Sequence, residues 1–286
     1  MDAAVLTETI TPGIYPDLPA EEYHADRGSL SSTGARRILA APALFRYEQD
    51  HPQPRRAVFD FGTAAHRLVL GDGPELVAVE ADDWRTKAAR EERDEVAAAG
   101  GLALLAADYD RVHDMADVIR RHPIASALFA PDGGRPEVSG FWRDELTGVM
   151  RRVRFDWLPH PRGGRLIVPD YKTTADASPE AIARSVDSYG YHQQAAWYLD
   201  GVRALDLGDE QAAFLLVLQE KTAPYLITVV ELDVEAMAIG AGRNRRALQV
   251  YAECIASGCW PGYVPDTQPL YLSLPPWAAK RDEEYL

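Results

Sequence analysis

The chain has 286 residues, 47% of them hydrophobic and 26% charged, and its formal net charge is −14. This length is ample for a hydrophobic core, and the acidic balance argues against a surface coated for nucleic-acid binding while leaving room for a local basic groove. The two cysteines, Cys254 and Cys259, are too few for a four-thiolate cluster or a zinc ribbon. Since no apolar run approaches membrane-spanning length and residues 1–11 lack a signal-peptide pattern, we expect a cytoplasmic protein without a membrane partner.

Helical signals dominate the first 130 residues. Residues 1–28 show no helical period and are expected to be extended and irregular, whereas caps, prolines and apolar spacing predict helices over about 29–40, 43–49, 59–71, 84–100, 106–121 and 123–129. Arg36, Arg37 and Arg46 in the first two helices fit either a solvated face or contacts to phosphate. His66 lies in the third helix, and a lone histidine among apolar residues is more often a core residue than a functional one.

Strand patterns begin after a turn at residues 131–134. Residues 136–143 and 149–158 alternate as two strands of a hairpin, and residues 166–172 follow as a third, so that we expect three antiparallel strands. Alternation places Met150, Arg152, Arg154 and Asp156 on one face of the second strand. Two arginines and an aspartate on one face are unusual for a core and suit a wet cleft that faces an anion.

The remainder of the chain predicts a mixed sheet flanked by helices, an α/β (α+β) fold. Helices are expected over 178–189, 191–201 and 234–257, and strands over 212–219 and 225–232. We divide the chain into an N-terminal helical region (1–130) that carries His66 and packs on the core, a core (131–260) and an irregular tail (261–286) with several prolines, together forming one structural unit.

Asp170 and Lys172 follow the buried strand signal of residues 166–168 and point to the same face. A surface ion pair is the simplest interpretation of this spacing alone. However, Asp156 and Asp170 can meet on neighbouring strands, and with the Tyr171 backbone carbonyl they would make an oxygen-rich site for Mg²⁺. Lys172 beside such an ion would orient or deprotonate the attacking water, or stabilise the negative charge of a transition state.

Together these motifs resemble the PD-(D/E)xK nuclease superfamily and, within it, the RecE-like phage and prophage exonucleases of the exodeoxyribonuclease VIII type. The resemblance extends from about residue 12 to residue 232, and the order and spacing of the motifs make it specific. The matching stretches are Gly13-Ile14-Tyr15, Tyr23-His24, Ser29-Leu30-Ser31, Gly62-Thr63-Ala64-Ala65-His66, Arg154-Phe155-Asp156 (Arg-Pro-Asp in the family), Asp170-Tyr171-Lys172-Thr173, Tyr189 to Gln194 with Tyr198, Gln219-Glu220-Lys221, and Pro224-Tyr225.

The resemblance implies a Mg²⁺-dependent 5′-to-3′ exodeoxyribonuclease, with Mn²⁺ able to substitute. Such an enzyme acts on the ends of linear double-stranded DNA in the bacterial cytoplasm and leaves 3′ single strands for a RecT-type annealing protein. It also implies a homo-oligomer. His66, Asp156, Asp170 and Lys172 fall on catalytic positions, and Gln194 and Tyr198 fall on a Gln-x-x-x-Tyr motif beside the DNA.

Some roles remain open from the sequence. His66 fits either a metal ligand, together with Asp156, Asp170 and the Tyr171 carbonyl, or a contact to the scissile phosphate. Glu137 fits a contact to a metal-bound water or a pair with an arginine. Further candidate phosphate contacts are Arg152, Arg154, Lys221, Arg243 and Arg246.

Two other functions are compatible with the sequence. One is a nuclease of the same superfamily that cuts internally or on single strands, because end preference depends on channel shape and oligomer closure. The other is a non-catalytic DNA-binding or assembly protein that has kept the fold. The intact set of His66, Asp156, Asp170 and Lys172 argues against the second.

Overall fold

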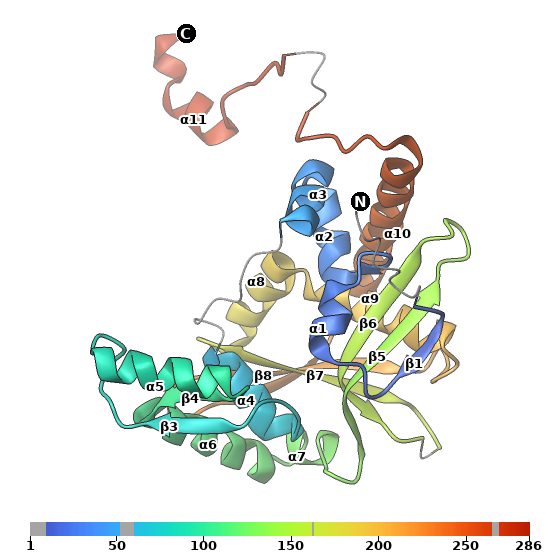
Figure 1. Cartoon of the computed structure of the whole chain (residues 1–286). Helices are drawn as coiled ribbons and strands as arrows, with labels where there is room; N and C mark the ends of the chain where they lie inside the picture. The colour runs from blue at the N-terminus through green and yellow to red at the C-terminus, as the bar shows by residue number, and fades with distance from the viewer. Residues whose placement is uncertain (1–9, 52–59, 162, 265–268) are drawn as a thin grey trace, which may run out of the picture.

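The computed structural model describes residues 10–51, 60–161, 163–264 and 269–286 (Figure 1). Its strands are β1 (Gly13–Tyr15), β2 (Leu30–Ser31), β3 (Leu76–Val79), β4 (Leu102–Leu105), β5 (Gly134–Arg143), β6 (Met150–Pro159), β7 (Ile167–Thr174), β8 (Ala213–Glu220) and β9 (Ile227–Glu231). Its helices are α1 (Ala20–Ala25), α2 (Ser32–Ala40), α3 (Pro42–Asp50), α4 (Asp60–Leu70), α5 (Lys87–Ala98), α6 (Ala106–Arg121), α7 (Ala125–Leu128), α8 (Pro179–Tyr189), α9 (Tyr191–Ala204), α10 (Val234–Ser257), α11 (Pro276–Arg281) and a short 3₁₀ turn over Glu283–Tyr285.

The hairpin β5–β6 is the centre of a four-stranded sheet with the order β1-β5-β6-β2. β1 is antiparallel to β5, and β2 is parallel to β6. The predicted alternation along β6 is confirmed, because Val153, Phe155 and Trp157 are buried while Arg154 and Asp156 on the other face are half-buried. The polar face of β6 is therefore available to a site.

β7 belongs to a second sheet, with the order β7-β8-β9, in which it is parallel to β8. The expectation that residues 166–172 form a third strand antiparallel to the hairpin is therefore wrong. β8 has the sequence AFLLVLQE and is almost wholly buried, so it takes the central position of this sheet. The long connection through α8 and α9 supplies the crossover that parallel strands need.

Helices α2, α9 and α10 pack over one hydrophobic core (Figure 1), which includes Phe155, Trp197, Phe214 and Leu248. α9 and α10 approach each other so closely that a Cβ on Gly240 would lie 2.1 Å from the carbonyl oxygen of His192. This close contact holds α9 firmly over the sheets, and α9 carries Gln194 and Tyr198 toward the polar face of β6.

A second core lies on the other side of β7, where α4 packs against the strand and α6 packs against α4. Ala64 and Ala65 are fully buried there with Tyr171 and Val217. Small residues let α4 approach β7 closely, and this contact places His66 next to the tyrosine ring at a centroid distance of 5.1 Å. The two cores thus hold α4, β6, β7 and α9 around one region.

Several local expectations are corrected by the structure. Residues 13–15 form a strand and residues 20–25 a helix where irregular chain was expected, and the short strands β3 and β4 pair in parallel within the region expected to be helical. α9 continues past Gly201 to Ala204 because Gly201 packs against Trp142, where its missing side chain provides room. In each case a tertiary contact decides what the local sequence leaves open.

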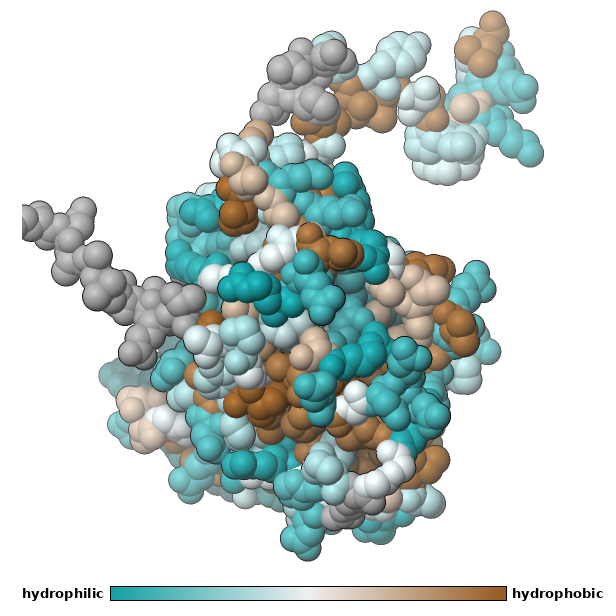
Figure 2. All heavy atoms as spheres, turned by 90° about the vertical axis from the view of Figure 1, so that its right-hand side faces the viewer, coloured by the Kyte–Doolittle hydropathy of each residue, from teal (hydrophilic) through white to brown (hydrophobic). Residues whose placement is uncertain are grey.

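The tail also differs from the expected irregular chain. Pro276 is the first residue of α11, a position at which proline favours a helix because no amide proton is needed there. Figure 2 shows this C-terminal segment projecting from the body of the molecule, with hydrophobic residues along it. Leu270, Tyr271 and Leu272 are largely exposed. Within the part of the chain that the structure describes, no helix is long and apolar enough to cross a membrane.

Candidate active site

Most of the residues singled out from the sequence meet in one cleft of about 630 Å³. α4 contributes His66, the hairpin strands contribute Glu137 and Asp156, and β7 contributes Lys172. Gln194 and Tyr198 from α9 line the same cleft, as do Arg152 and Arg154 from β6. Asp170 lies directly beneath the cleft, where its side chain is almost fully buried.

Asp170 and Lys172 form an ion pair through the Oδ2 of the aspartate. The other carboxylate oxygen, Oδ1, accepts a hydrogen bond of 2.8 Å from Nε2 of Gln194. Because the aspartate is buried, this is not the surface ion pair that is the simplest interpretation of the sequence. Gln194 and Lys172 together fix the orientation of a buried acid, and the ammonium group of Lys172 is held at the cleft.

His66, Glu137 and Asp156 each offer a ligand atom within 4.8 Å of the other two. Val138 pairs with Phe155 and Pro136 with Trp157, so the hairpin register sets Glu137 opposite Asp156. The Nδ1 of His66 lies 3.8 Å from Oδ2 of Asp156. Two carboxylates and an imidazole in this arrangement fit a divalent cation.

The three acids of the site have raised pKa values. Burial, with the charge of Asp156, raises the pKa of Asp170 to about 6. Burial also raises the pKa of Asp156 and, together with the neighbouring Asp156, that of Glu137. A raised pKa means that the charged form of each acid is destabilised. A bound cation would stabilise that form, which agrees with a metal site.

The two basic groups of the site have opposite protonation states near pH 7. Burial and the charge of Lys172 lower the pKa of His66 to about 4, so its imidazole is neutral and free to act as a ligand. Burial opposes the charge of Lys172, but the carboxylates of Asp170 and Asp156 outweigh it and raise the pKa of the lysine. Lys172 therefore remains a cation.

The arginines of the cleft differ in their partners. Arg152 pairs with Asp26 at 2.8 Å, and Arg154 pairs with Glu137 at 2.6 Å. Arg36 donates to the hydroxyl of Thr33, and its buried Nε has no partner. Among the residues that the structure describes, Arg36 is thus a cleft arginine that forms no ion pair, and its guanidinium is well placed to meet a phosphate.

Other expected contacts lie farther away or have structural roles. The hydroxyl of Tyr198 donates to the carbonyl of Arg154 at 2.8 Å and so fixes α9 to β6. Lys221 lies in an adjoining cavity, whereas Arg243 and Arg246 are carried by α10 and are not among the residues that line the cleft.

Tyr191 belongs to a stretch that carries the family resemblance, but sequence reasoning assigns it no role; its ring centroid lies 6.0 Å from Nζ of Lys172. The predicted break between the helices at Gly190 is confirmed, and φ of 65° at this glycine lets Tyr191 begin a new helix at the cleft.

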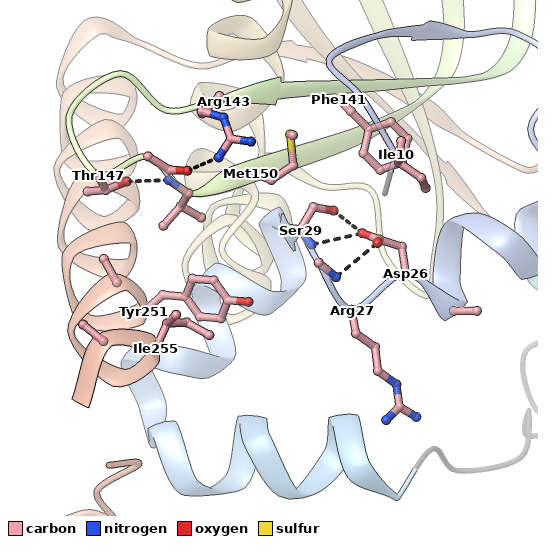
Figure 3. A pocket seen from close by; sticks show the side chains of 16 residues that line it. Ile10, Asp26, Arg27, Ser29, Phe141, Arg143, Thr147, Met150, Tyr251 and Ile255 are labelled. Atoms are coloured by element: carbon pink, nitrogen blue, oxygen red, sulfur yellow. Dashed lines mark hydrogen bonds between the residues drawn. The ribbon is translucent and has the colours of Figure 1, made fainter. Parts of the chain in front are cut away.

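A separate pocket of about 680 Å³ lies between α10, the turn of the β5–β6 hairpin and residues 25–29 (Figure 3). The carboxylate of Asp26 accepts hydrogen bonds there from Gly28 and Ser29, and Arg143 donates to the carbonyl of Gly148. These polar groups are engaged within the chain, and the pocket shares none of the acidic cluster. We therefore assign the chemistry to the cleft of His66 and Lys172.

Comparisons with known proteins bear on the fold and the family of the chain. A crystal structure from Eubacterium rectale, described as "Putative exonuclease", aligns with a TM-score of 0.55 over 90% of this chain and 96% of that chain at 14% identity. A structure of a protein called SSO0001 aligns over 84% and 83% of the two chains at 14% identity, with a TM-score of 0.37. No curated protein matches the chain significantly. Residues 42–268 match the family model described as "PDDEXK-like domain of unknown function (DUF3799)", and the chain therefore belongs to this family of PDDEXK-like domains.

Proposed function

We propose that this protein is a metal-dependent deoxyribonuclease that hydrolyses phosphodiester bonds in the cleft of His66 and Lys172. The observation that carries the proposal is that a buried Asp170–Lys172 pair opens onto the same cleft as the His66, Glu137 and Asp156 group. A fold shared with a described exonuclease and membership of the PDDEXK-like family support it.

Mg²⁺, or Mn²⁺ in its place, is the ion that we propose for the site. Asp156 would hold it with His66 and Glu137, and Asp170 and the Tyr171 carbonyl remain candidate ligands from the sequence. A bound divalent ion would supply a nucleophile at neutral pH and neutralise charge on the phosphate. Burial raises the pKa of all three acids, and repulsion by Asp156 adds to the shift of Asp170 and Glu137, so a bound cation would stabilise their charged forms.

Lys172 has a specific role in this proposal. The carboxylates of Asp170 and Asp156 raise its pKa and favour its protonated form, so we assign it the role of a cation rather than that of a base. Its ammonium group instead stabilises the negative charge that develops on the phosphate oxygens, and it orients the attacking water. Gln194 keeps Asp170 in place through the bond to Oδ1, so the lysine is held in a fixed position by a fixed acid.

We propose further that the substrate is linear double-stranded DNA, degraded from its 5′ ends to leave 3′ single strands for recombination. The resemblance to RecE-like exonucleases supports this direction, a RecT-type annealing partner and a homo-oligomer. Arg36 in the cleft supports a phosphate-bearing substrate, since its buried Nε is without a partner.

The test is digestion of a linear duplex labelled at either its 5′ or its 3′ ends, beside the same DNA as a closed circle, with Mg²⁺ or a chelator. The proposal predicts early release of the 5′ label and survival of the circle. Cleavage of the circle would instead indicate an endonuclease of the same superfamily. Degradation of single strands alone would indicate a single-strand nuclease, and binding without cleavage a non-catalytic DNA-binding protein.

A further inference from the structure

A second cavity of about 470 Å³ adjoins the active-site cleft, and Tyr189 and Tyr191 line both. The second cavity lies between the end of β7, α8 and the start of the β8–β9 connection. We call it the tyrosine-rimmed cavity, and its polar and aromatic lining consists of Thr173, Thr174, Asp176, Arg184, Ser185, Ser188, Tyr189, Tyr191 and Lys221. The two tyrosines therefore stand at the border between the cleft of Lys172 and this cavity.

The two tyrosines present aromatic surface at the junction of the cavities. Their ring centroids are 5.6 Å apart with an interplanar angle of 30°, and 59% of Tyr189 is exposed. Gly190 between them adopts φ of 65°, a left-handed conformation that turns the chain so that α8 ends and α9 begins at this point. An exposed tyrosine beside a catalytic cleft can stack on any base, because every base has an aromatic face.

The charges of the tyrosine-rimmed cavity favour an anion. Arg184 and Lys221 both line it, and in the described part of the chain neither forms an ion pair within 4.0 Å. The acid of the cavity, Asp176, accepts a hydrogen bond at Oδ1 from the backbone N–H of Ser178, and it also interacts electrostatically with Arg184 without forming an ion pair. Two cations outside any ion pair, with hydroxyl groups around them, complement a phosphate backbone, although the whole protein is acidic.

We propose that the tyrosine-rimmed cavity binds the unpaired segment of the DNA strand adjacent to the scissile phosphodiester. This inference rests on the proposed nuclease function and adds that the cleft receives a single strand rather than an intact duplex. The reason is that a base inside a duplex is covered on both faces by its neighbours, so Tyr189 can stack on a base beyond the duplex end only if that base is unpaired. Arg184 and Lys221 would then neutralise the phosphates of that segment.

The first test measures binding in the presence of a chelator, so that no turnover occurs. The probes are a duplex with a single-stranded overhang that contains 2-aminopurine and a matched blunt duplex. The parent protein should quench the 2-aminopurine and bind the overhang more tightly. Tyr189→Leu should relieve the quench and weaken overhang binding by about 5- to 100-fold, the range for loss of one stacked base, with blunt-duplex binding unchanged. Tyr271→Leu, at an exposed tyrosine of the tail, is the matched control.

The second test measures the salt dependence of overhang binding. Removing both charges with Arg184→Gln and Lys221→Gln should reduce the slope of log affinity against log salt by about 0.7 for each phosphate that is no longer neutralised. Lys280→Gln, at an exposed lysine of α11, should leave the slope unchanged. Circular dichroism and thermal melting confirm that each variant is folded.

The outcomes separate this inference from the nuclease proposal. If the parent degrades DNA but Tyr189→Leu quenches and binds as the parent does, the cavity does not hold the strand and the inference is overturned. If the parent binds and quenches the overhang through Tyr189 but cleaves nothing with Mg²⁺ or Mn²⁺, the nuclease proposal fails while the strand-binding cavity stands.

Discussion

The backbone N–H of Tyr171 donates a hydrogen bond of 2.9 Å to Oδ2 of Asp156. The amide belongs to β7 and the acid to β6, and these strands lie in different sheets. N–H groups alternate between the two edges of a strand, so the amide of Tyr171 leaves β7 on the same edge as the nitrogen of Pro169, which carries no proton. The edge of β7 that faces β6 is therefore not occupied by a ladder, and it is free to bind the acid of the site.

This hydrogen bond predicts a difference between two substitutions of the same acid. Asp156→Asn keeps a carbonyl oxygen for the Tyr171 amide, whereas Asp156→Ala leaves that amide without its partner. We expect Asp156→Ala to be less stable than Asp156→Asn by about 1–3 kcal/mol, the cost of a buried donor that is left unsatisfied. Denaturant unfolding in chelator measures the difference, and equal stabilities would show that the bond has no structural role.

The position of Glu137 opposite Asp156 predicts that it contributes to metal binding. Glu137→Gln should weaken Mn²⁺ or Mg²⁺ binding by roughly 10- to 100-fold, a range typical even of residues that only orient a ligand. Calorimetric titration measures the affinity. The matched control is Glu231→Gln, because Glu231 is an acid of strand β9 that also pairs with an arginine, Arg165. Unchanged affinity in Glu137→Gln would leave Glu137 only as the partner of Arg154.

The raised pKa of Asp170 predicts that metal affinity increases with pH between about 5 and 7. Its pKa is raised to about 6, so below that pH the group carries a proton that a cation must displace. His66, with its pKa lowered to about 4, is already neutral throughout this range and adds no dependence of its own. The affinity should rise by up to about tenfold per pH unit for one displaced proton. Calorimetry at pH 5, 6 and 7 checks this, and a flat profile would exclude coupling of the buried acid to the metal.

Arg151 lies on the apolar face of β6, and we expect its substitution to change the stability of the protein. Its guanidinium lies 4.0 Å from the ring centroid of Trp197 and 4.7 Å from that of Trp142, and it pairs with Asp200 at 3.0 Å. Arg151→Met should lower the free energy of unfolding by about 1–3 kcal/mol, because the buried guanidinium loses its indole contacts and its bond to Asp200, while Asp200 keeps its pair with Arg203. Arg165→Met, at an exposed pair, should cost at most about 1 kcal/mol. Denaturant unfolding compares the two, and similar losses would contradict the role of the burial of Arg151.

Much of the site's local geometry could be predicted from the sequence. The alternation along β6 correctly separates Arg154 and Asp156 from the buried Phe155, and the spacing of Asp170 and Lys172 correctly places them on one face. These inferences need only the two-residue period of a strand. They hold because neighbouring side chains in one strand are related by covalent geometry alone.

The pairing of strands could not be predicted in the same way. Whether β7 joins the β5–β6 hairpin or pairs with β8 depends on the packing of distant segments, and the sequence pattern of β7 allows both. The same limit applies to Glu137, whose place opposite Asp156 depends on the register of the hairpin. Tyr191 reaches Lys172 only because two helices join at Gly190.

The most direct measurement is the rate at which the parent and Lys172→Ala degrade an end-labelled linear duplex, each with Mg²⁺ and with chelator. Metal and DNA binding are measured on the same preparations. We predict that the parent degrades the duplex only with the metal. We expect Lys172→Ala to be slower by about 100-fold or more while it still binds both ligands, because it lacks only the cation that stabilises the transition state. Cleavage by Lys172→Ala at the parent rate, or cleavage by the parent in chelator, would contradict the assignment of this cleft as a metal-dependent nuclease site.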